Sequence, residues 1–379
     1  MKISILAFDL SDNATGRADL LARLLSPLGE VEVVGPRFGE AIWRPAVGGP
    51  VKYRARAVGD AARWPRFATH WRALVAQADG DVLYASKPRA TSFGVALVAR
   101  RQRPRPLLLD VDDWEVGFFR RGGAWGTVGR ALNLANPNGL PWTWLMEHRI
   151  GRAAAITVAS RFLERRFGGT LVPHVRDTEA WSPARYERAP ARAALGLGGE
   201  RVVMFLGTPR GHKGVDDLVE AVGAVGGDTR LLVVGADTRS AAARRWASQP
   251  WVRVLGEIAF DDVPRYLAAA DVVAVPQRAT TDTVGQVPAK IFDAMALGRP
   301  IVSTAVSMIP EILDGCGILV PPGNVVALAA SLRRVLDDPV TAAALGRRAR
   351  ERCCERYSFA AARAALFPVV ERALAGAAT

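Results

Sequence analysis

Short apolar runs that alternate with helical segments are the feature that most constrains the fold of this chain. In the second half, nearly continuous apolar runs recur, each followed by a loop, at 202–206, 231–234, 252–255, 272–275, 301–303 and 317–320. Strands buried on both faces of a sheet have this composition, because neither face is left for polar side chains. Strands that alternate with helical segments predict a parallel sheet covered by helices on both faces.

The first half repeats this pattern. Its predicted strands lie at 3–8, 31–34, 81–85, 107–111 and 155–158, and a helix at 17–28 follows the first loop. The polar segment 172–189, which contains Pro173 and Pro183, is typical of a linker. We therefore predict an α/β fold with two doubly wound parallel-sheet domains that face each other across a cleft. The predicted domains cover 1–183 and 184–358, and a helical segment at 359–379 is expected to pack back on the first.

The size and charge of the chain limit its class. At 379 residues the chain exceeds the size at which a single core usually divides, which agrees with two domains. The formal net charge is +13 and the sequence pI is about 10.5. Such a surface attracts phosphate groups on nucleic acid, anionic lipid or a phosphorylated substrate, although an arginine-rich coding bias is the alternative explanation. Because no nucleic-acid recognition motif occurs, we expect no nucleic-acid partner.

The cysteines and the N-terminus indicate the compartment. Cys316, Cys353 and Cys354 match neither a disulfide framework nor a zinc site, which favours a reducing environment. Residues 1–8 are predicted to form a strand, because they lack the long apolar core and the cleavage pattern of a signal peptide. No run of about 18 apolar residues is present, so no transmembrane helix is expected. We expect a cytoplasmic protein, either free or peripheral at the inner face of a membrane.

A glycine-rich loop with two cations follows the first strand of the second half. In the segment 206–214, three glycines allow close backbone approach, and Arg210 and Lys213 can place two positive charges over one diphosphate. A solvated charge at a helix start is the alternative for Lys213, and His212 in the same loop is equally explained by contact with a ligand or with solvent. The loop lacks the GK[ST] ending of a P-loop, and neither first βα turn has the GxGxxG fingerprint, so a nicotinamide enzyme is disfavoured.

The segment 283–304 predicts a loop, a short helix, a glycine stop and a buried strand. Pro288 suits a helix start, and Gly298 ends the helix. A helix N-terminus offers free N–H groups and the positive end of a dipole, which suits an anion. Asp293 lies early in this helix and can accept hydrogen bonds from a ribose diol. An ordinary αβ unit with a surface aspartate is the alternative.

Carboxylates and cations also follow two strands of the first half. Three aspartates in four residues, ending with Asp112 and Asp113, can hold a metal, but no calcium-loop spacing follows, and we predict no metal site. We prefer contact of Asp112 or Asp113 with an acceptor, with Asp113 as a proton relay; a capping aspartate is the alternative. Lys87 and Arg89 lie just past another strand and can meet an acceptor phosphate.

Aromatic and basic residues alternate between Trp114 and Trp144. The aromatic and basic residues of this segment include Phe118, Phe119, Arg120, Arg121, Trp125, Trp142 and Trp144. Aromatic rings beside arginines suit a membrane interface or an aromatic acceptor pocket. The same residues can also simply cover the core. Peripheral membrane contact through 114–145 is therefore one of the predictions that the sequence allows.

Together, the segments 206–214 and 283–304 resemble the retaining, nucleotide-sugar-dependent glycosyltransferases of family 4, which have two Rossmann-like domains in the GT-B arrangement. Four further segments resemble the family in the same order. Residues 9–16 look like the first-loop glycine region that faces the acceptor and the donor phosphates, and 158–163 is similar to "tvaS..l". Residues 171–183 are similar to "vPngvDtd.F.P", and 255–272 to the region that contacts the base. The resemblance spans nearly the whole chain and is stronger in the second half. It implies that the first domain binds the acceptor and the second the nucleotide sugar.

The resemblance also implies a set of donor-binding residues. Lys213 matches the family's phosphate-binding lysine, whereas Thr208 stands where the family has arginine, and Arg210 is the candidate substitute. Of the family's two glutamates, the second matches Asp293 and the first falls on Gly285, so that Gln286 or the N–H groups near Val287 would serve instead. Lys290 fits a subgroup variant and adds a cation near the phosphates. The donor-binding set is Gly16, Gly207, Thr208, Arg210, Lys213, Gly235, Glu257, Ile258, Gln286, Val287, Lys290 and Asp293.

The reaction that the resemblance implies is sugar transfer with retention, on the front face and without a covalent enzyme intermediate. Arg210, Lys213 and the helix dipole would stabilise the departing diphosphate. The donor would be a UDP- or GDP-sugar with no further cofactor, and the acceptor a small molecule, a glycan or a lipid-linked hydroxyl. An epimerase or phosphorylase on the same fold is one alternative. A non-catalytic nucleotide-sugar-binding subunit is another, because Gly285 replaces an acidic residue.

Overall fold

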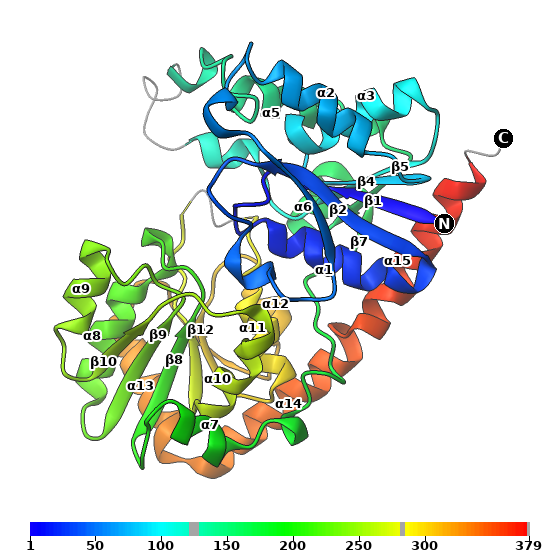
Figure 1. Cartoon of the computed structure of the whole chain (residues 1–379). Coiled ribbons are helices and arrows are strands. Elements are labelled where there is room, and N and C mark those ends of the chain that lie inside the picture. Colours follow the sequence, from blue (N-terminus) through cyan, green and yellow to red (C-terminus); the bar gives the residue numbers. More distant parts are fainter. Residues whose placement is uncertain (121–128, 281–284, 377–379) are drawn as a thin grey trace. The chain divides into compact units, whose positions relative to one another are not determined.

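The structure is a computed structural model that describes residues 1–120, 129–280 and 285–376 (Figure 1). The chain forms two compact units. The first unit consists of Met1–His174 and the C-terminal segment from Ala362, and the second of Val175–Ala361. The division at His174 falls inside the segment 172–189 that the sequence marks as a linker, earlier than the predicted boundary at 183. Among the helices of the described residues, none is both long and apolar enough to span a bilayer.

The first unit contains a parallel sheet with the order β3-β2-β1-β4-β5-β6-β7 in the described part of the chain. Its strands are β1 (Lys2–Leu6), β2 (Glu30–Arg37), β3 (Lys52–Ala57), β4 (Val82–Ser86), β5 (Leu107–Val111), β6 (Ala155–Val158) and β7 (Thr170–Leu171). The strands predicted at 107–111 and 155–158 have these bounds, and three others differ by a few residues. The prediction missed β3 and β7. Strand β3 is an edge strand with alternating basic residues and no apolar run, and β7 is only two residues long.

The central strands β1, β4 and β5 of the first sheet are almost entirely buried. On one face, Leu83 and Leu109 join Phe67 and Phe93 in a single buried cluster. The helices of the unit are α1 (Thr15–Leu25), α2 (Ala68–Gln77), α3 (Val95–Gln102), α5 (Leu140–Glu147), α6 (Arg161–Phe167) and α15 (Phe359–Ala375). The predicted helix 17–28 ends earlier, at Leu25, because Pro27 and Gly29 follow and the chain makes a 3-10 turn there. On α15, Arg363 Nε donates a hydrogen bond to the carbonyl oxygen of Leu24, 3.1 Å away.

The second unit contains a parallel sheet with the order β10-β9-β8-β11-β12-β13 among the described residues. The strands are β8 (Arg201–Leu206), β9 (Thr229–Val234), β10 (Val252–Leu255), β11 (Val272–Val275), β12 (Ile301–Thr304) and β13 (Ile318–Val320). All six were predicted, two of them with these bounds. Each is short and apolar enough to be recognised from the sequence, because both of its faces are buried.

Helices cover both faces of the second sheet (Figure 1). Side chains along β8 point alternately toward one face and the other, so each face carries an apolar set. Met204 and Leu206 point into one buried cluster, which includes side chains of α10 (Val263–Ala269), α11 (Lys290–Ala296) and α14 (Pro339–Arg356). Val203 and Phe205 point into another, which includes side chains of α8 (Val215–Val225), α9 (Ala241–Ala247) and α13 (Val325–Asp337). The remaining helices of the unit are α7 (Arg188–Ala194) and α12 (Ile309–Leu313).

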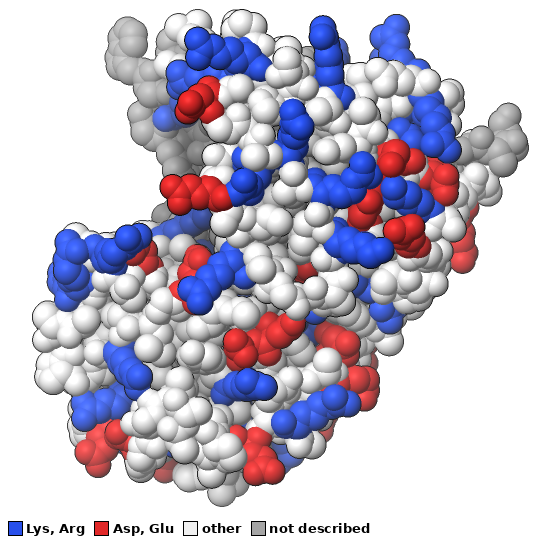
Figure 2. Space-filling model, in the orientation of Figure 1, with Lys and Arg blue, Asp and Glu red and all other residues white. Residues whose placement is uncertain are grey.

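The strong positive charge is not gathered into one block on the visible face. Figure 2 shows lysine and arginine side chains interspersed with aspartate and glutamate over this face. Several arginines are paired with acidic residues, such as Arg245 with Asp216 and Arg201 with Asp337. Exposed pairs of this kind add little to stability but keep the local potential low.

A buried ion pair fixes α1 against the first sheet. Arg17 Nε and Nη2 each donate to a carboxylate oxygen of Asp110 at 2.8 Å, and both side chains are almost fully buried. Arg17 Nη2 also donates to the carbonyl oxygen of Val172 at 2.7 Å, and Thr157 Oγ1 donates to Asp110 Oδ1 at 2.7 Å. This bidentate ion pair and its hydrogen bonds therefore link α1 to β5, to β6 and to the backbone at Val172.

We predict that Arg17→Met lowers the free energy of unfolding by about 3–5 kcal/mol, because the Asp110 carboxylate is left buried without its cation. Urea denaturation followed by tryptophan fluorescence measures this change. Lys52→Met is the matched control: Lys52 pairs with Glu30 at 3.4 Å in an exposed position, and its removal is expected to change stability by less than about 0.5 kcal/mol. Equal effects of the two variants would contradict the prediction.

Candidate functional site

The loops that follow β8, β9, β10 and β11 lie at one edge of the second sheet. Because the paired strands are parallel, their carboxyl ends share this edge. From β8 the chain builds the sheet in one direction through β9 and β10, and then returns to place β11 on the other side of β8. Ligands of open α/β sheets bind where the strand order reverses in this way. The switch between β8 and β11 is therefore the first place to look for a site.

Gly214 holds the loop after β8 against the loop after β11. Its φ angle is +67°, and a Cβ atom added to it would lie 1.8 Å from the carbonyl oxygen of Pro276. The backbone N–H of Arg278 donates to the carbonyl oxygen of His212 at 2.8 Å, which adds a second link between the loops. Only glycine combines this backbone conformation with so close an approach.

Lys213 is held at the switch point by neutral amide groups. Its Nζ donates to Gln286 Oε1 at 3.1 Å and to Gln277 Oε1 at 3.4 Å. Both Lys213 and Gln286 belong to the predicted donor-binding set, and the structure brings them together although 73 positions separate them. Gln277 was not predicted. The signal that would have found it is its place in the loop directly after β11, the same kind of position that drew attention to the loop of Lys213.

The ammonium group of Lys290 is buried at the same place. Its Nζ lies 3.6 Å from the ring centroid of Phe205 and has no hydrogen-bond partner among the described residues. The residue is 9% exposed. Burial, reinforced by the charge of Lys213 and partly opposed by Asp293, holds the pKa of Lys290 well below its ordinary value. A buried ammonium without a hydrogen-bond acceptor is costly, and it marks a place where an anion would be stabilised.

Two glycines of the predicted set lie close to Lys290 and to each other. Gly207 and Gly235 follow β8 and β9 with φ angles of +100° and +99°. A Cβ atom on Gly207 would lie 3.5 Å from the Nζ of Lys290, and one on Gly235 would lie 3.0 Å from the backbone of Gly207. The loops after β8 and β9 therefore pack closely here, and no side chain separates the backbone of Gly207 from the ammonium group.

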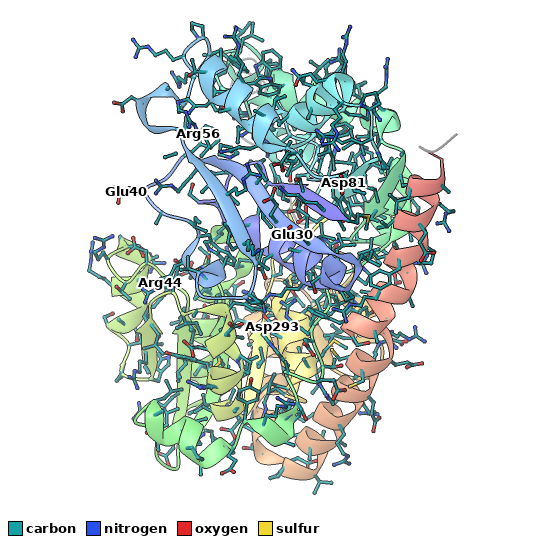
Figure 3. All side chains as sticks on the ribbon, turned by 45° about the vertical axis from the view of Figure 1, so that its right-hand side comes forward. Glu30, Glu40, Arg44, Arg56, Asp81 and Asp293 are labelled. Carbon is teal, nitrogen blue, oxygen red and sulfur yellow. The ribbon has the colours of Figure 1, made fainter. Side chains whose placement is uncertain are left out.

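Asp293 is paired more strongly than the sequence indicated. Arg176 Nε donates to Asp293 Oδ1, and both side chains are buried. Burial raises the pKa of Asp293, and the Arg176 guanidinium opposes this shift. Figure 3 shows Asp293 on α11. Arg176 lies in the linker segment 172–189 and was not predicted as a site residue. The contact of Asp293 with a ribose stays a prediction.

The remaining predicted donor residues of this unit lie around the same edge in different environments. Thr208 and Arg210 are exposed, and no hydrogen bond or ion pair involves the guanidinium of Arg210 within the described part of the chain. Glu257 and Ile258 are half-buried in the loop after β10. Val287 is buried in the core. Thr283 and Val284 lie outside the described residues.

Helix α11 is shorter than predicted. It begins at Lys290 rather than at Pro288 and has seven residues. The N–H groups of Ile291 and Phe292 donate to the carbonyl oxygens of Pro288 and Ala289, so the preceding turn already uses part of the predicted anion-binding backbone. Side-chain cations, rather than a helix dipole, are therefore the stronger anion-binding feature of this site.

The predicted acceptor residues form a buried charge cluster in the first unit. Lys87 Nζ lies 2.7 Å from Asp112 Oδ1, 2.8 Å from Asp113 Oδ2 and 2.8 Å from Glu115 Oε1. Burial opposes the charge of Lys87, but the three carboxylates outweigh it and raise its pKa well above the ordinary value. Lys87 also has a φ angle of +74°, which is unusual for a residue with a side chain. Its ammonium lies among carboxylates that would otherwise be grouped closely enough to hold a metal ion.

Arg89 completes this cluster. Its Nε donates to Glu115 Oε2 at 2.6 Å and its Nη1 to the carbonyl oxygen of Asn138 at 2.8 Å. Burial alone would raise the pKa of Glu115, but Arg89 and Lys87 hold it below its ordinary value. Burial raises the pKa of Asp112 to about 7 in spite of Lys87. The cations therefore have carboxylate partners here, and their contact with an acceptor phosphate stays a prediction.

Two further predictions concern the first unit. Gly16 lies in the first turn of α1, where a Cβ atom would come within 3.2 Å of the ring of Trp43; its donor contact stays a prediction. In the aromatic segment, Trp142 Nε1 donates to the carbonyl oxygen of Leu134, whereas Trp144 is 52% exposed. Arg121 and Trp125 lie outside the described residues.

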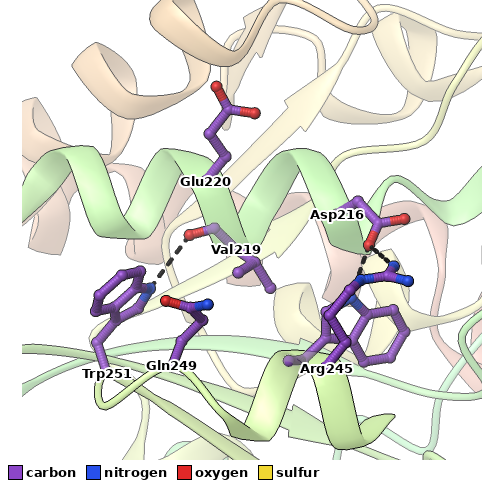
Figure 4. A pocket seen from close by; sticks show the side chains of 7 residues that line it. Asp216, Val219, Glu220, Arg245, Gln249 and Trp251 are labelled. Carbon is purple, nitrogen blue, oxygen red and sulfur yellow. Dashed lines mark hydrogen bonds and ion pairs between the residues drawn. The ribbon is translucent and has the colours of Figure 1, made fainter. Parts of the chain in front are cut away.

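A surface pocket of the second unit lies elsewhere, between α8 and α9 (Figure 4). Asp216 Oδ1 accepts hydrogen bonds from Trp246 Nε1 at 2.7 Å and from Arg245 Nη2 at 2.6 Å. Trp251 Nε1 donates to the carbonyl oxygen of Val219. These polar groups satisfy one another, and no predicted site residue lines the pocket, so the switch point remains the candidate site.

Comparison with known proteins gives the class of the chain. Residues 200–338, which contain the switch point, match the family described as Glycosyl transferases group 1. The chain is a relative of the glycosyltransferases. The GDP-mannose-dependent alpha-(1-6)-phosphatidylinositol monomannoside mannosyltransferase of Mycolicibacterium smegmatis is 28% identical over 307 residues, 74% of each chain. The D-inositol 3-phosphate glycosyltransferase of Saccharomonospora viridis is 33% identical over 228 residues, 54% of this chain and 50% of that protein.

The match to several of these glycosyltransferases spans only about half of their length. Solved structures confirm the fold over the whole chain. Sucrose-phosphate synthase of Thermosynechococcus elongatus has a TM-score of 0.73 at 21% identity and covers 99% of this chain and 100% of its own. Alr3699/HepE of Anabaena, solved with UDP and glucose, has a TM-score of 0.73 at 20% identity and covers 98% and 99%. The predicted GT-B fold is thus confirmed. Because the family match and the relatives above are glycosyltransferases, the epimerase, phosphorylase and non-catalytic alternatives are not favoured.

We predict that Gly214→Ala disturbs the switch point. The left-handed backbone and the contact with Pro276 together are expected to lower the free energy of unfolding by at least about 2 kcal/mol. Urea denaturation measures the effect. Gly211→Ala in the same loop is the control, because Gly211 has no neighbour within 4 Å of an added Cβ atom and no positive φ angle. If both variants unfold at the wild-type urea concentration, the loop is not clamped as described.

Proposed function

We propose that this protein is a retaining glycosyltransferase of family 4 that uses a nucleoside diphosphate sugar, a UDP- or GDP-sugar, as donor. The observation that carries the proposal is the pair of lysines at the β8/β11 switch, inside the part of the chain that matches Glycosyl transferases group 1. Lys213 binds neutral amides and Lys290 has no hydrogen-bond acceptor among the described residues. Together they offer two basic side chains to one anion.

In this proposal the diphosphate of the donor lies over Gly207, whose backbone no side chain separates from the Nζ of Lys290. Lys213 binds it from the loop after β8, and the exposed Arg210 can move toward it. In the same proposal, Asp293 accepts hydrogen bonds from the ribose, and Glu257 and Ile258 after β10 contact the base. The sugar, without the family's first glutamate, contacts Gln286 and the N–H groups near Val287.

In the proposed reaction, the bond between the sugar C1 and the diphosphate oxygen breaks while the acceptor oxygen bonds to C1 on the same face. The acceptor proton leaves through Asp113, as a relay, to the departing diphosphate. The negative charge that develops on the diphosphate is stabilised by Lys213 and Arg210, and preorganised charges of this kind supply the largest part of catalysis. No metal ion is required for this stabilisation in the proposal, because the cations come from side chains.

The first unit is proposed to bind the acceptor through Asp112 and Asp113. Relatives are named for phosphatidylinositol monomannoside and for D-inositol 3-phosphate. We propose an acceptor that carries a hydroxyl-rich head group linked to a lipid. This choice is supported by three exposed apolar residues of the first unit, Leu132 (75% exposed), Leu134 (61%) and Trp144 (52%).

We predict that Lys213→Ala lowers the transfer rate roughly 10²- to 10³-fold, the usual effect of removing one charge-stabilising donor. The assay offers UDP-glucose or GDP-mannose with phosphatidylinositol monomannoside, inositol 3-phosphate and 2-deoxystreptamine. Proton NMR of the product gives the configuration at C1, and retention is expected. Lys52→Ala, an exposed lysine of the first unit, is the control for loss of one positive charge. Full activity of Lys213→Ala, or a product of inverted configuration, would contradict the proposal.

We predict that the double variant Leu132→Ser/Trp144→Ser binds vesicles of phosphatidylglycerol and phosphatidylcholine at least about tenfold more weakly, because two apolar side chains no longer enter the interface. Cosedimentation measures the bound fraction. Val326→Ser is the control, because Val326 is 81% exposed on α13 of the second unit. If wild-type protein stays in the supernatant, membrane contact through 114–145 is refuted.

A further inference from the structure

We propose that Lys290 takes the place of the family's missing basic residue at position 208 as the second diphosphate ligand, and that it takes up a proton when the diphosphate binds. This inference rests on the proposed function and gives Lys290 a specific role in it. Thr208 carries no charge, and the side chain of Arg210 is exposed and makes no ion pair within the described residues. Lys290, by contrast, is already at the switch point before any ligand arrives.

Geometry supports a ligand at Lys290 in two independent ways. Its Nζ lies against the face of Phe205 with no hydrogen-bond acceptor in the described part of the chain. The side-chain amide nitrogen of Gln277, on a fully buried residue beside Lys213, also lacks a partner there. Buried donors are almost always satisfied in folded proteins. An anion bound near Gly207 would supply an acceptor to the ammonium, and a polar ligand there is the simplest explanation for both donors.

The charges that face Lys290 explain the proton uptake. Lys213, from the loop after β8, repels its positive form, and burial disfavours that form further. Asp293 on the same helix attracts it, but Arg176 already pairs with that carboxylate. Gln286, next to Lys213, is neutral. In the free protein the pKa of Lys290 is therefore lowered, and a bound diphosphate would raise it again by adding negative charge.

The sign of the pH dependence follows from this shift. The ligand favours the protonated amine, so binding draws in a proton at any pH that lies above the pKa of the free protein and below that of the complex. Affinity for the diphosphate is then highest on the acidic side of this window and falls as the pH rises through it. A lysine that kept its ordinary pKa would give neither effect near neutral pH.

The test is isothermal titration of UDP, GDP and inorganic pyrophosphate into the full chain at about pH 8, in Tris and in HEPES. These buffers differ in ionisation enthalpy, so the difference in heat counts the protons that are taken up. We expect uptake of a substantial fraction of one proton by the wild type. For Lys290→Met we expect no uptake and roughly tenfold or weaker binding, because a charged hydrogen bond is lost. Lys52→Met is expected to behave as wild type.

Each outcome is decisive. Binding of UDP or GDP with the same heat in both buffers overturns this inference and leaves the proposed function standing. No binding of either nucleotide overturns both. Proton uptake that persists in Lys290→Met assigns it to another group and also overturns the inference. If the methionine variant does not fold, Lys290→Arg serves instead: its guanidinium stays charged, so binding without proton uptake is expected.

Discussion

The common direction of the strands in the second sheet is the constraint on which the candidate site depends. Because the strands are parallel, the loops after β8, β9, β10 and β11 end at one edge, and the return of the chain to β11 brings two of them into contact. Gly214 makes this contact possible, since any side chain there would meet the carbonyl oxygen of Pro276. This packing positions Lys213, Gln277 and the backbone of Gly207. No interaction that is local in the sequence does so.

The buried lysines of the two units have opposite electrostatic surroundings. Lys87 is surrounded by the carboxylates of Asp112, Asp113 and Glu115, which stabilise its charge. Lys290 has an aromatic ring and a second lysine nearby, and burial works against its charge. A buried cation that is neutralised by its neighbours contributes to the structure of its unit, whereas one that is not is a candidate for binding an anion. This contrast is why the second unit offers the stronger anion-binding site.

Much of the fold was predictable because buried parallel strands have a distinct composition. All six strands of the second sheet were recognised from apolar runs, but β3, with its basic residues at a sheet edge, was not. In the site, Lys213, Gln286 and Lys290 were predicted from the resemblance, with glycines and position after a strand in support. The partners were not predictable: Arg176 pairs with Asp293 across 117 positions, and Arg17 with Asp110 across 93. Such pairs depend on how distant segments pack, which a single sequence does not encode in any local pattern.

The sequence by itself determined that this chain forms two α/β units, because apolar periodicity is a property of short segments, and it marked the loops in which basic and glycine residues follow strands. Only the tertiary structure decided which of these residues share a site and in what charge state. The packing surrounds Lys87 with carboxylates, so its charge is paired. It leaves Lys290 buried without a hydrogen-bond acceptor among the described residues. The physical reason is that burial and neighbouring charge set the behaviour of an ionisable group, and both arise only when the segments are packed together.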